Sequence, residues 1–237
     1  MNRNELLSAK GLSKSFSGFN ALRHVSFDLR ERDILGIIGP NGAGKTTLLE
    51  CLVGLLPVNS GEVFWKSEPL TNSGRKDVMF YLPQDIVPYG EQPAFRLMGL
   101  YREVYGLSCE REHEVVARLK LKNVLGRRIG ELSRGYRRRL LLALALLTPK
   151  PLLLLDEPFD GLDPRQTVEV VDLLCEESAA GRTLVLSIHQ LADAARICSR
   201  YLLLVEGKVV GYGTIEELRT QAGVESTNLE AIFFALT

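Results

Sequence analysis

The sequence predicts an α/β fold with a mixed, largely parallel central sheet, an N-terminal antiparallel β part and an inserted helical subdomain. Three observations predict this class. A glycine-rich loop near residue 40 joins a short apolar run to a helix-like stretch, as a loop between a buried strand and a helix does. In the C-terminal half, runs that are apolar on both faces alternate with helix-like segments, which is typical of parallel strands covered by helices. From Pro93 to about Leu147 the pattern is helical.

The composition is that of one globular domain. The chain has 237 residues, 46% of them hydrophobic, so we expect one domain over residues 1–237 with the helical subdomain at about 90–147. Lys and Arg together number 29, as do Asp and Glu, and the resulting zero net charge gives no general attraction to nucleic acid or acidic lipid. The cysteine spacing fits no metal pair or disulfide framework, which predicts reduced thiols in a cytosolic protein. The cysteines are Cys51, Cys109, Cys175 and Cys198.

We expect no membrane-spanning segment and no signal segment. The most apolar region, Leu140 to Leu155, is divided by Pro149-Lys150-Pro151. Neither half reaches the roughly 20 residues that a spanning helix needs. The N-terminal residues Met1 to Glu5 are not followed by an apolar stretch of the kind that directs secretion.

Local patterns place the remaining elements. Residues 5–16 and 21–30 are expected to form an antiparallel pair joined by a turn at 17–20, because 25–30 alternates apolar and polar side chains. Capping-box patterns beginning at Thr214 and Thr227 predict two short helices that close the chain. Further strands are expected at 34–38, 62–65, 78–82, 152–155, 183–188 and 201–205, and further helices at 46–53, 137–147, 164–179 and 190–198.

The glycine-rich loop fills every fixed position of the phosphate-loop pattern G-x-x-x-x-G-K-[ST], so we expect a P-loop NTPase core. Its glycines let backbone N–H groups approach phosphates, and the following helix adds its positive N-terminal end. Lys45 is expected to reach the β- and γ-phosphates, and the Thr46 hydroxyl to hold Mg²⁺. The candidate nucleotide-binding residues are Gly39, Pro40, Asn41, Gly42, Ala43, Gly44, Lys45, Thr46 and Thr47.

Polar residues follow several of the expected strands, where ligands collect in open α/β sheets. Asp156 ends the apolar run 152–155 and is suited to hold Mg²⁺. Glu157 lies one residue further on, where a carboxylate can orient or deprotonate the water that attacks the γ-phosphate. Gln84 and His189 follow two other strands and are expected to reach the γ-phosphate. Gln84 is a candidate for both the catalytic and the metal site.

A second anion site is predicted at Leu132 to Tyr136, before the helix that we expect from Arg137. Ser133 is a good N-cap residue, and Gly135 leaves the backbone open. One chain does not need two anion sites to bind one nucleotide.

These segments, in this order, resemble the ATP-binding-cassette family over nearly the whole chain. The resemblance implies that ATP and Mg²⁺ bind, that ATP is hydrolysed to drive transport, and that two cassettes pair head to tail. ATP then lies between one subunit's phosphate loop and the partner's Ser133 and Gly135. Glu157, His189 and Gln84 carry over as catalytic residues, and Asp163 as the link between the two sites. Phe16 matches the residue that stacks on adenine, with simple core packing as an equal alternative.

The signature departs from the family pattern at two positions, where Arg134 replaces a glycine and Tyr136 a glutamine. Arg134 is expected either to add charge near the partner's γ-phosphate or to point to solvent. The arginines at 134 and 137–139 raise the possibility of nucleic-acid binding. We do not expect it, because no aromatic residues are interleaved and the net charge is zero.

The variant signature, Tyr105-Gly106-Leu107 and the ending Leu229 to Phe233 resemble the ATP-binding subunits of ABC-2 type exporters. That resemblance implies a second cassette, either this chain or a close paralogue, and separately encoded membrane subunits whose coupling helix meets residues 90–147. It also implies a peripheral location on the cytoplasmic face of the membrane. The alternatives are the cassette of a small importer and a soluble cassette ATPase that acts on ribosomes or DNA. Soluble relatives usually carry two cassettes in one chain or a long coiled-coil insertion, and this chain has neither.

Overall fold

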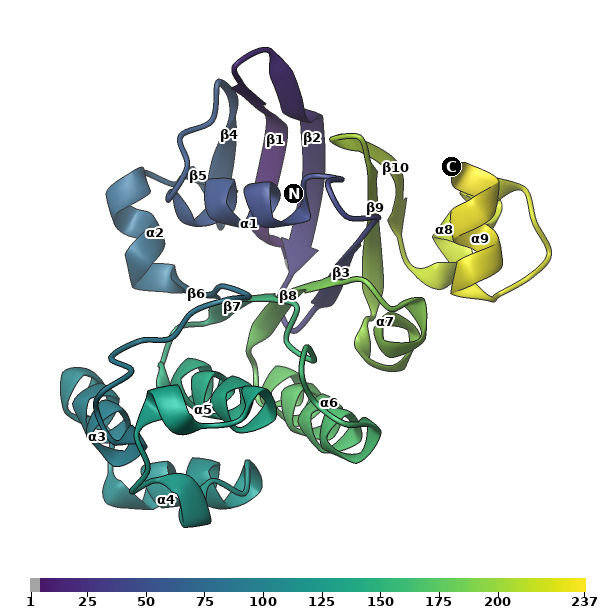
Figure 1. The fold of residues 1–237 in the computed structure, drawn as a ribbon. Coiled ribbons are helices and arrows are strands. Elements are labelled where there is room, and N and C mark those ends of the chain that lie inside the picture. The colour runs from purple at the N-terminus through teal and green to yellow at the C-terminus, as the bar shows by residue number, and fades with distance from the viewer. Residues whose placement is uncertain (1–4) are drawn as a thin grey trace.

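A computed structural model describes residues 5–237, in which two β-sheets are surrounded by helices (Figure 1). The first sheet is antiparallel, with strand order β2-β1-β4-β5. Its strands are β1 (Glu5–Phe16), β2 (Phe19–Arg30), β4 (Ser60–Trp65) and β5 (Glu68–Pro69). This confirms the predicted N-terminal antiparallel part. The first turn is shorter than expected, because Ser17 and Gly18 both have positive φ and reverse the chain in two residues.

The second sheet is the predicted mixed, largely parallel sheet. Its strand order is β10-β9-β3-β8-β7-β6, and every neighbouring pair is parallel except β10 with β9. Its strands are β3 (Ile34–Ile38), β6 (Met79–Leu82), β7 (Leu152–Asp156), β8 (Thr183–Ile188), β9 (Arg200–Val205) and β10 (Lys208–Gly213). The strands β3, β7 and β8 are buried at every residue, as runs that are apolar on both faces require.

The hydrophobic core lies on both faces of the second sheet. In β7, Leu153 and Leu155 join the cluster formed with the helices that follow Pro93, whereas Leu152 and Leu154 join the cluster beneath the first sheet. Burial of each of these side chains contributes about 1.5–3 kcal/mol. The strand is therefore fixed on both sides, and its carboxyl end is held in a defined position.

Helices follow the strands, and three of them, α3, α4 and α5, gather on the side away from the first sheet (Figure 1). The helices are α1 (Lys45–Val53), α2 (Asn72–Val78), α3 (Ala94–Tyr105), α4 (Cys109–Arg118), α5 (Arg134–Leu147), α6 (Pro164–Ala179), α7 (Leu191–Ile197), α8 (Ile215–Ala222) and α9 (Leu229–Leu236), with 3-10 turns at Lys122–Val124 and Ile129–Glu131. Within residues 5–237, no helix combines the length and the apolar character needed to cross a bilayer.

Two details of the expected helices are corrected and one is confirmed. Helix α5 begins at Arg134 rather than Arg137, because the Ser133 side chain caps it and accepts a hydrogen bond from the Tyr136 amide. The capping box at Thr214 is confirmed by reciprocal bonds with Glu217. The box at Thr227 is wrong, because Asn228 is the N-cap and accepts from the Glu230 amide at 2.8 Å.

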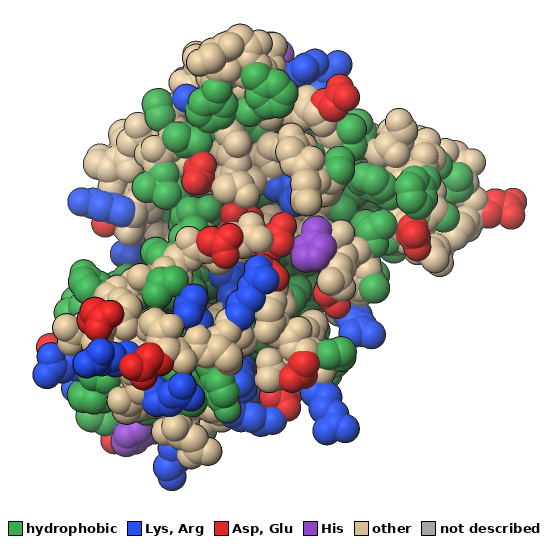
Figure 2. All heavy atoms as spheres, viewed as in Figure 1, with side chains coloured by type: hydrophobic (Ala, Val, Ile, Leu, Met, Phe, Trp, Pro, Cys, Tyr) green, Lys and Arg blue, Asp and Glu red, His purple; other side chains and the backbone are tan. Residues whose placement is uncertain are grey.

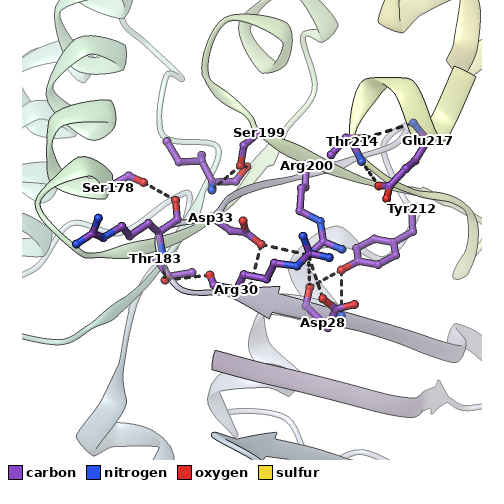
Figure 3. Close-up of polar contacts among 12 residues, drawn as sticks. Asp28, Arg30, Asp33, Ser178, Thr183, Ser199, Arg200, Tyr212, Thr214 and Glu217 are labelled. Carbon is purple, nitrogen blue, oxygen red and sulfur yellow. Dashed lines mark hydrogen bonds and ion pairs between the residues drawn. The ribbon is translucent and has the colours of Figure 1, made fainter. Parts of the chain in front are cut away.

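A buried arginine joins the two sheets (Figure 3). Arg200, the first residue of β9, is 6% exposed and donates hydrogen bonds to the carboxylates of Asp28 and Asp33, each at 3.1 Å. The Tyr212 ring lies 4.7 Å from its guanidinium carbon, and the Tyr212 hydroxyl bonds to the Asp28 backbone. Because a buried ion pair is costly to break, this cluster fixes the first sheet against β9 and β10.

Candidate nucleotide site

The phosphate loop connects β3 to α1 in a conformation that requires glycine. Gly42 and Gly44 have φ of 81° and 102°. A Cβ on Gly44 would overlap the Ala21 carbonyl oxygen, and one on Gly39 would overlap that of Leu204. Gly44 is the N-cap of α1, and no side chain among the described residues caps it. The first amides of α1 are therefore left for an anion, which their partial positive charge favours.

Lys45 is folded onto the loop. Its side chain is 6% exposed, and Nζ donates to the carbonyl oxygens of Gly39 at 2.7 Å and Pro40 at 3.1 Å. Burial lowers the pKa of Lys45, and the nearby carboxylates of Glu157 and Asp156 act in the opposite direction. A poorly hydrated ammonium at the mouth of the loop is well suited to meet a phosphate.

Asp156 gathers hydroxyl groups around its carboxylate at the end of β7. It is 1% exposed, and Oδ2 accepts from Thr46 Oγ1 at 2.8 Å and from the Tyr81 hydroxyl at 3.4 Å. Oδ1 accepts from Ser187 Oγ. One carboxylate beside one threonine hydroxyl fits Mg²⁺, which takes most of its ligands from phosphates and water. No group of three or more His, Cys, Asp or Glu able to hold a metal occurs within residues 5–237.

Glu157 lies at the point where three neighbouring strands end. Its Oε2 lies 3.0 Å from His189 Nδ1, beyond β8, and accepts from Gln84 Nε2, beyond β6, at 3.3 Å. Its φ is 48°, which is uncommon for a residue with a side chain. Its amide donates to Ser187 Oγ at 2.9 Å. The structure thus brings together the three residues that the sequence selected as catalytic, in a backbone conformation often found at functional sites.

Figure 2 shows charged side chains and a histidine gathered where the two halves of the molecule meet. A cavity of about 370 Å³ lies beside the phosphate loop. The residues that line this cavity include Phe16, Phe19, Ala21, Asn41, Gly42, Gly44, Lys45, Thr46, Thr47, Gln84 and Glu157. Phe16 is 43% exposed, so it is not part of the hydrophobic core. Phe19, which is not among the residues predicted from the sequence, pairs with Phe16 across the two-residue turn.

The signature residues do not reach this cavity. Neither Ser133 nor Gly135 is among the described residues that line it, and Ser133 is exposed at the start of α5. A Cβ on Gly135 would lie 2.9 Å from the Gly161 carbonyl oxygen, so close packing within the chain also requires glycine there. The two predicted anion sites are therefore separate in one chain.

The two unusual signature residues have contacts of their own. Arg134, rather than being free in solvent, forms an ion pair with Asp160, whose Oδ2 also accepts from Gln84 Nε2 at 3.4 Å. The Tyr136 ring lies 4.4 Å from the guanidinium carbon of Arg139, a cation–π contact. Asp163 is the N-cap of α6 and forms a capping box there.

Two of the signature arginines are buried, which was not predicted from the sequence. Arg138 and Arg139 are only 4% and 5% exposed. Arg138 donates to the backbone carbonyl of Gln84 and to the carbonyls on both sides of Glu157. The helical spacing that places position 138 on the same face as Leu141 and Leu142 was the available signal.

A phosphate loop, a buried carboxylate bonded to its threonine, and polar residues at three adjacent strand ends define a nucleoside triphosphatase of the P-loop class. Comparison with known protein families matches residues 22–160 to the family described as ABC transporter. The chain belongs to this family, which confirms the resemblance seen in the sequence.

Relatives match over nearly the full chain. The ABC-type transporter ATP-binding protein EcsA of Bacillus subtilis is 30% identical over 98% of this chain and 96% of its own. The lipopolysaccharide export system ATP-binding protein LptB of Acidithiobacillus ferridurans is 32% identical over 90% and 92%. A solved structure of an ATP-binding subunit of an ABC transporter superimposes with a TM-score of 0.89, at 29% identity over 98% and 99%. The protein is thus an ABC ATP-binding subunit, which hydrolyses ATP to power transport.

Proposed function

We propose that this chain drives an ABC-2 type exporter, in which ATP binding closes a head-to-tail dimer of two such subunits. The observation that carries the proposal is the separation of the two anion sites. Ser133 and Gly135 lie outside the cavity beside the phosphate loop, so a second copy is needed to bring a signature to the nucleotide. Two relatives that serve export favour this assignment: besides LptB, the Nod factor export ATP-binding protein I of Burkholderia lata is 32% identical over 86% of this chain and 69% of its own.

We assign the nucleotide contacts within one subunit as follows. The loop residues 39–47 hold the phosphates, with Lys45 at the β- and γ-phosphates. Phe16 and Phe19, 43% and 59% exposed, stack against the base. Thr46, Asp156 and Gln84 hold Mg²⁺, which when bound neutralises charge on the phosphate oxygens.

Glu157 acts as the general base in this proposal. Gln84 donates to the same oxygen, Oε2, that lies beside His189, so these residues fix the orientation of the carboxylate. The other oxygen, Oε1, is then the one that takes the proton from the attacking water. His189 and Gln84 hold that arrangement from the two neighbouring strands.

The membrane subunit is proposed to dock beside the helical subdomain at about 90–147, within a single domain that spans residues 1–237. A second cavity of about 370 Å³ lies between the segment after Gln84 and α5. Apolar side chains at its edge are exposed, with Ile86 at 39% and Val87 at 48%. Phe95 on the adjoining α3 is 50% exposed. A helix carrying apolar residues fits this surface, and docking there would hold the chain on the cytoplasmic face of the membrane.

The test is coexpression with the proteins encoded by the neighbouring genes, among which a membrane protein would be the proposed partner. We expect this chain and that membrane protein to copurify in detergent, and we expect the double variant Ile86→Asp, Val87→Asp to lose the membrane protein while retaining ATP binding. The matched control is Val168→Asp on α6, a residue that is 46% exposed and lies outside the proposed surface. A wild-type chain that stays wholly cytosolic beside its coexpressed neighbour would contradict the exporter assignment and favour a soluble ATPase.

A further inference from the structure

We propose that Arg138 is a positioning residue that ties the Gln84 segment and the backbone around Glu157 to helix α5, so that hydrolysis depends on it more than ATP binding does. The proposal rests on the roles given above to Gln84 and Glu157. Among the described residues that line the cavity beside the phosphate loop, Arg138 does not occur.

The contacts of Arg138 come from two separate segments. Nη1 donates to the carbonyl oxygens of Pro83 at 3.1 Å and Gln84 at 3.2 Å, just after β6. Nε donates to the Pro158 oxygen at 3.2 Å, and Nη2 donates to the Asp156 oxygen, at the end of β7. One planar guanidinium therefore joins four carbonyls on neighbouring strand ends, which its fixed fork of donors allows.

These carbonyls set the position of the reacting groups. Asp156 and Pro158 flank Glu157, whose φ of 48° needs support from its surroundings. The bonds to Pro83 and Gln84 fix the backbone from which the Gln84 amide reaches Glu157 Oε2. Without the guanidinium, buried carbonyls on both segments lose their donor and the two strand ends lose their common anchor.

The charge of Arg138 suits this place. Burial lowers its pKa to about 10, with the carboxylates of Asp156, Asp160, Asp85 and Glu157 acting in the opposite direction. The side chain is therefore protonated near neutral pH. Because it bonds to carbonyl oxygens, it offsets the negative charge of the site while leaving the carboxylates of Asp156 and Glu157 to other partners.

Arg138 also links the two anion sites. It lies one turn after Ser133 and Gly135 on the same helix, and it lines the second cavity together with Ile86 and Val87. A displacement of α5 is therefore transmitted to the backbone on either side of Glu157 in the same subunit.

Arg138→Gln, compared with Arg139→Gln, tests the proposal in the full chain. Arg139 is a matched control, because it is equally buried on α5 but contacts the Leu119 oxygen and the Tyr136 ring. For Arg138→Gln we expect kcat for MgATP to fall by about 10- to 100-fold, since small misplacements of reacting groups have effects of this size. The Kd for ATP should stay within about threefold, because the phosphate loop is not touched. Arg139→Gln should change neither quantity by more than about threefold.

Hydrogen exchange provides a readout that does not depend on activity. The amides of residues 84–88 and 156–160 should exchange faster in Arg138→Gln than in Arg139→Gln, at equal global stability. Arg138→Lys keeps the charge but cannot serve four carbonyls, and it should recover only a small part of kcat. If the Gln variant fails to fold, the Lys variant carries the same comparison.

Two results of the kinetic and binding assays would overturn the proposal. One is an equal loss of kcat in Arg138→Gln and Arg139→Gln, and the other is a loss of ATP affinity as large as the loss of kcat. The exchange measurement needs no membrane partner, so the exporter assignment can fail while this inference stands. Conversely, an intact exchange pattern in Arg138→Gln removes the inference and leaves the exporter assignment untouched.

Discussion

In the phosphate-loop half of the site, the side chains already contact one another within one chain: Lys45 is buried on its own loop, and Thr46 bonds to Asp156 at 2.8 Å. In the signature half, the groups proposed to meet a nucleotide face outward. Ser133 is exposed and bonds to its own helix, and the Arg134 side chain is 66% exposed. The phosphate-loop half is thus ready to bind a ligand, whereas the signature half presents donors to a group outside the chain.

The difference separates binding from turnover. Substitutions in the phosphate-loop half should change the affinity for ATP, and those in the signature half should change the rate of ATP hydrolysis. Substitutions at the strand ends between the two halves should change the rate of the chemical step. Interactions that strengthen only in the transition state raise kcat, whereas those present in the ground state also change affinity.

The largest expected effect is that of Glu157→Gln. Gln keeps the size of the side chain but removes the basic oxygen, so we expect kcat to fall by about 10²- to 10⁴-fold. ATP affinity should stay within about threefold, because the groups that bind phosphate are unchanged. Single-turnover hydrolysis and equilibrium ATP binding measure the two effects, and gel filtration with MgATP should show more dimer. Near-normal hydrolysis would show that Glu157 is not the base.

Ser133→Asp should have the next largest effect. The carboxylate keeps the capping acceptor for the Tyr136 amide but directs a negative charge at the partner's phosphate, so we expect kcat to fall by about 10²-fold. Ser133→Asn is the control, because it caps equally well and is neutral; it should lose far less activity. ATP binding to the monomer should be unchanged in both. Equal hydrolysis by the two variants would contradict the placement of Ser133 at a nucleotide.

Much of the fold followed from the sequence, since runs such as Leu152 to Leu155 can be buried on both faces only in a central sheet. Helix α2 and strand β10 were missed. Helix α2 is polar and contains Gly74, and it is stabilised by the Thr71 cap and by Arg75, which bonds to the Cys51 oxygen in α1. The Thr71 cap is local but stands before no apolar periodicity, and the Arg75 contact comes from tertiary structure.

The candidate site, like the fold, was predicted only in part from the sequence. Residues in the phosphate loop were found because the loop's chemistry fixes their spacing. Arg138 was missed because its partners are 18–55 residues away in the chain, so only the folded sheet reveals them. Phe19 and Tyr81 were missed because their relevance depends on the residues that lie beside them in the folded chain.

Lys45→Met tests the phosphate-loop half directly. A charge-assisted hydrogen bond contributes about 1.5–3 kcal/mol, so the Kd for ATP should rise by about 10- to 100-fold. Lys208→Met on the exposed part of β10 is the control for a lost positive charge and should leave the Kd unchanged. Equilibrium titration with a fluorescent ATP analogue measures both. An unchanged Kd for ATP in Lys45→Met would contradict the conclusion that the phosphate-loop half is ready to bind a ligand.

The smallest effect is expected for Arg134→Gly, which restores the glycine usual at that signature position. Arg134 pairs with Asp160, but its side chain is 66% exposed, and exposed ion pairs contribute about 0–1 kcal/mol. Gly in the first turn of α5 adds a similar small cost. We therefore expect kcat within about threefold of wild type and a slightly lower melting temperature. If the pair is the only role of Arg134, Asp160→Asn should have a similarly small effect on kcat, and the double variant should lose no more kcat than either single variant. A fall in kcat above about tenfold in Arg134→Gly, without an equal fall in Asp160→Asn, would instead place the guanidinium at the partner's γ-phosphate. That outcome would sharpen the contrast between the halves, because the signature would then supply a cation from the partner, in addition to Lys45 within the chain.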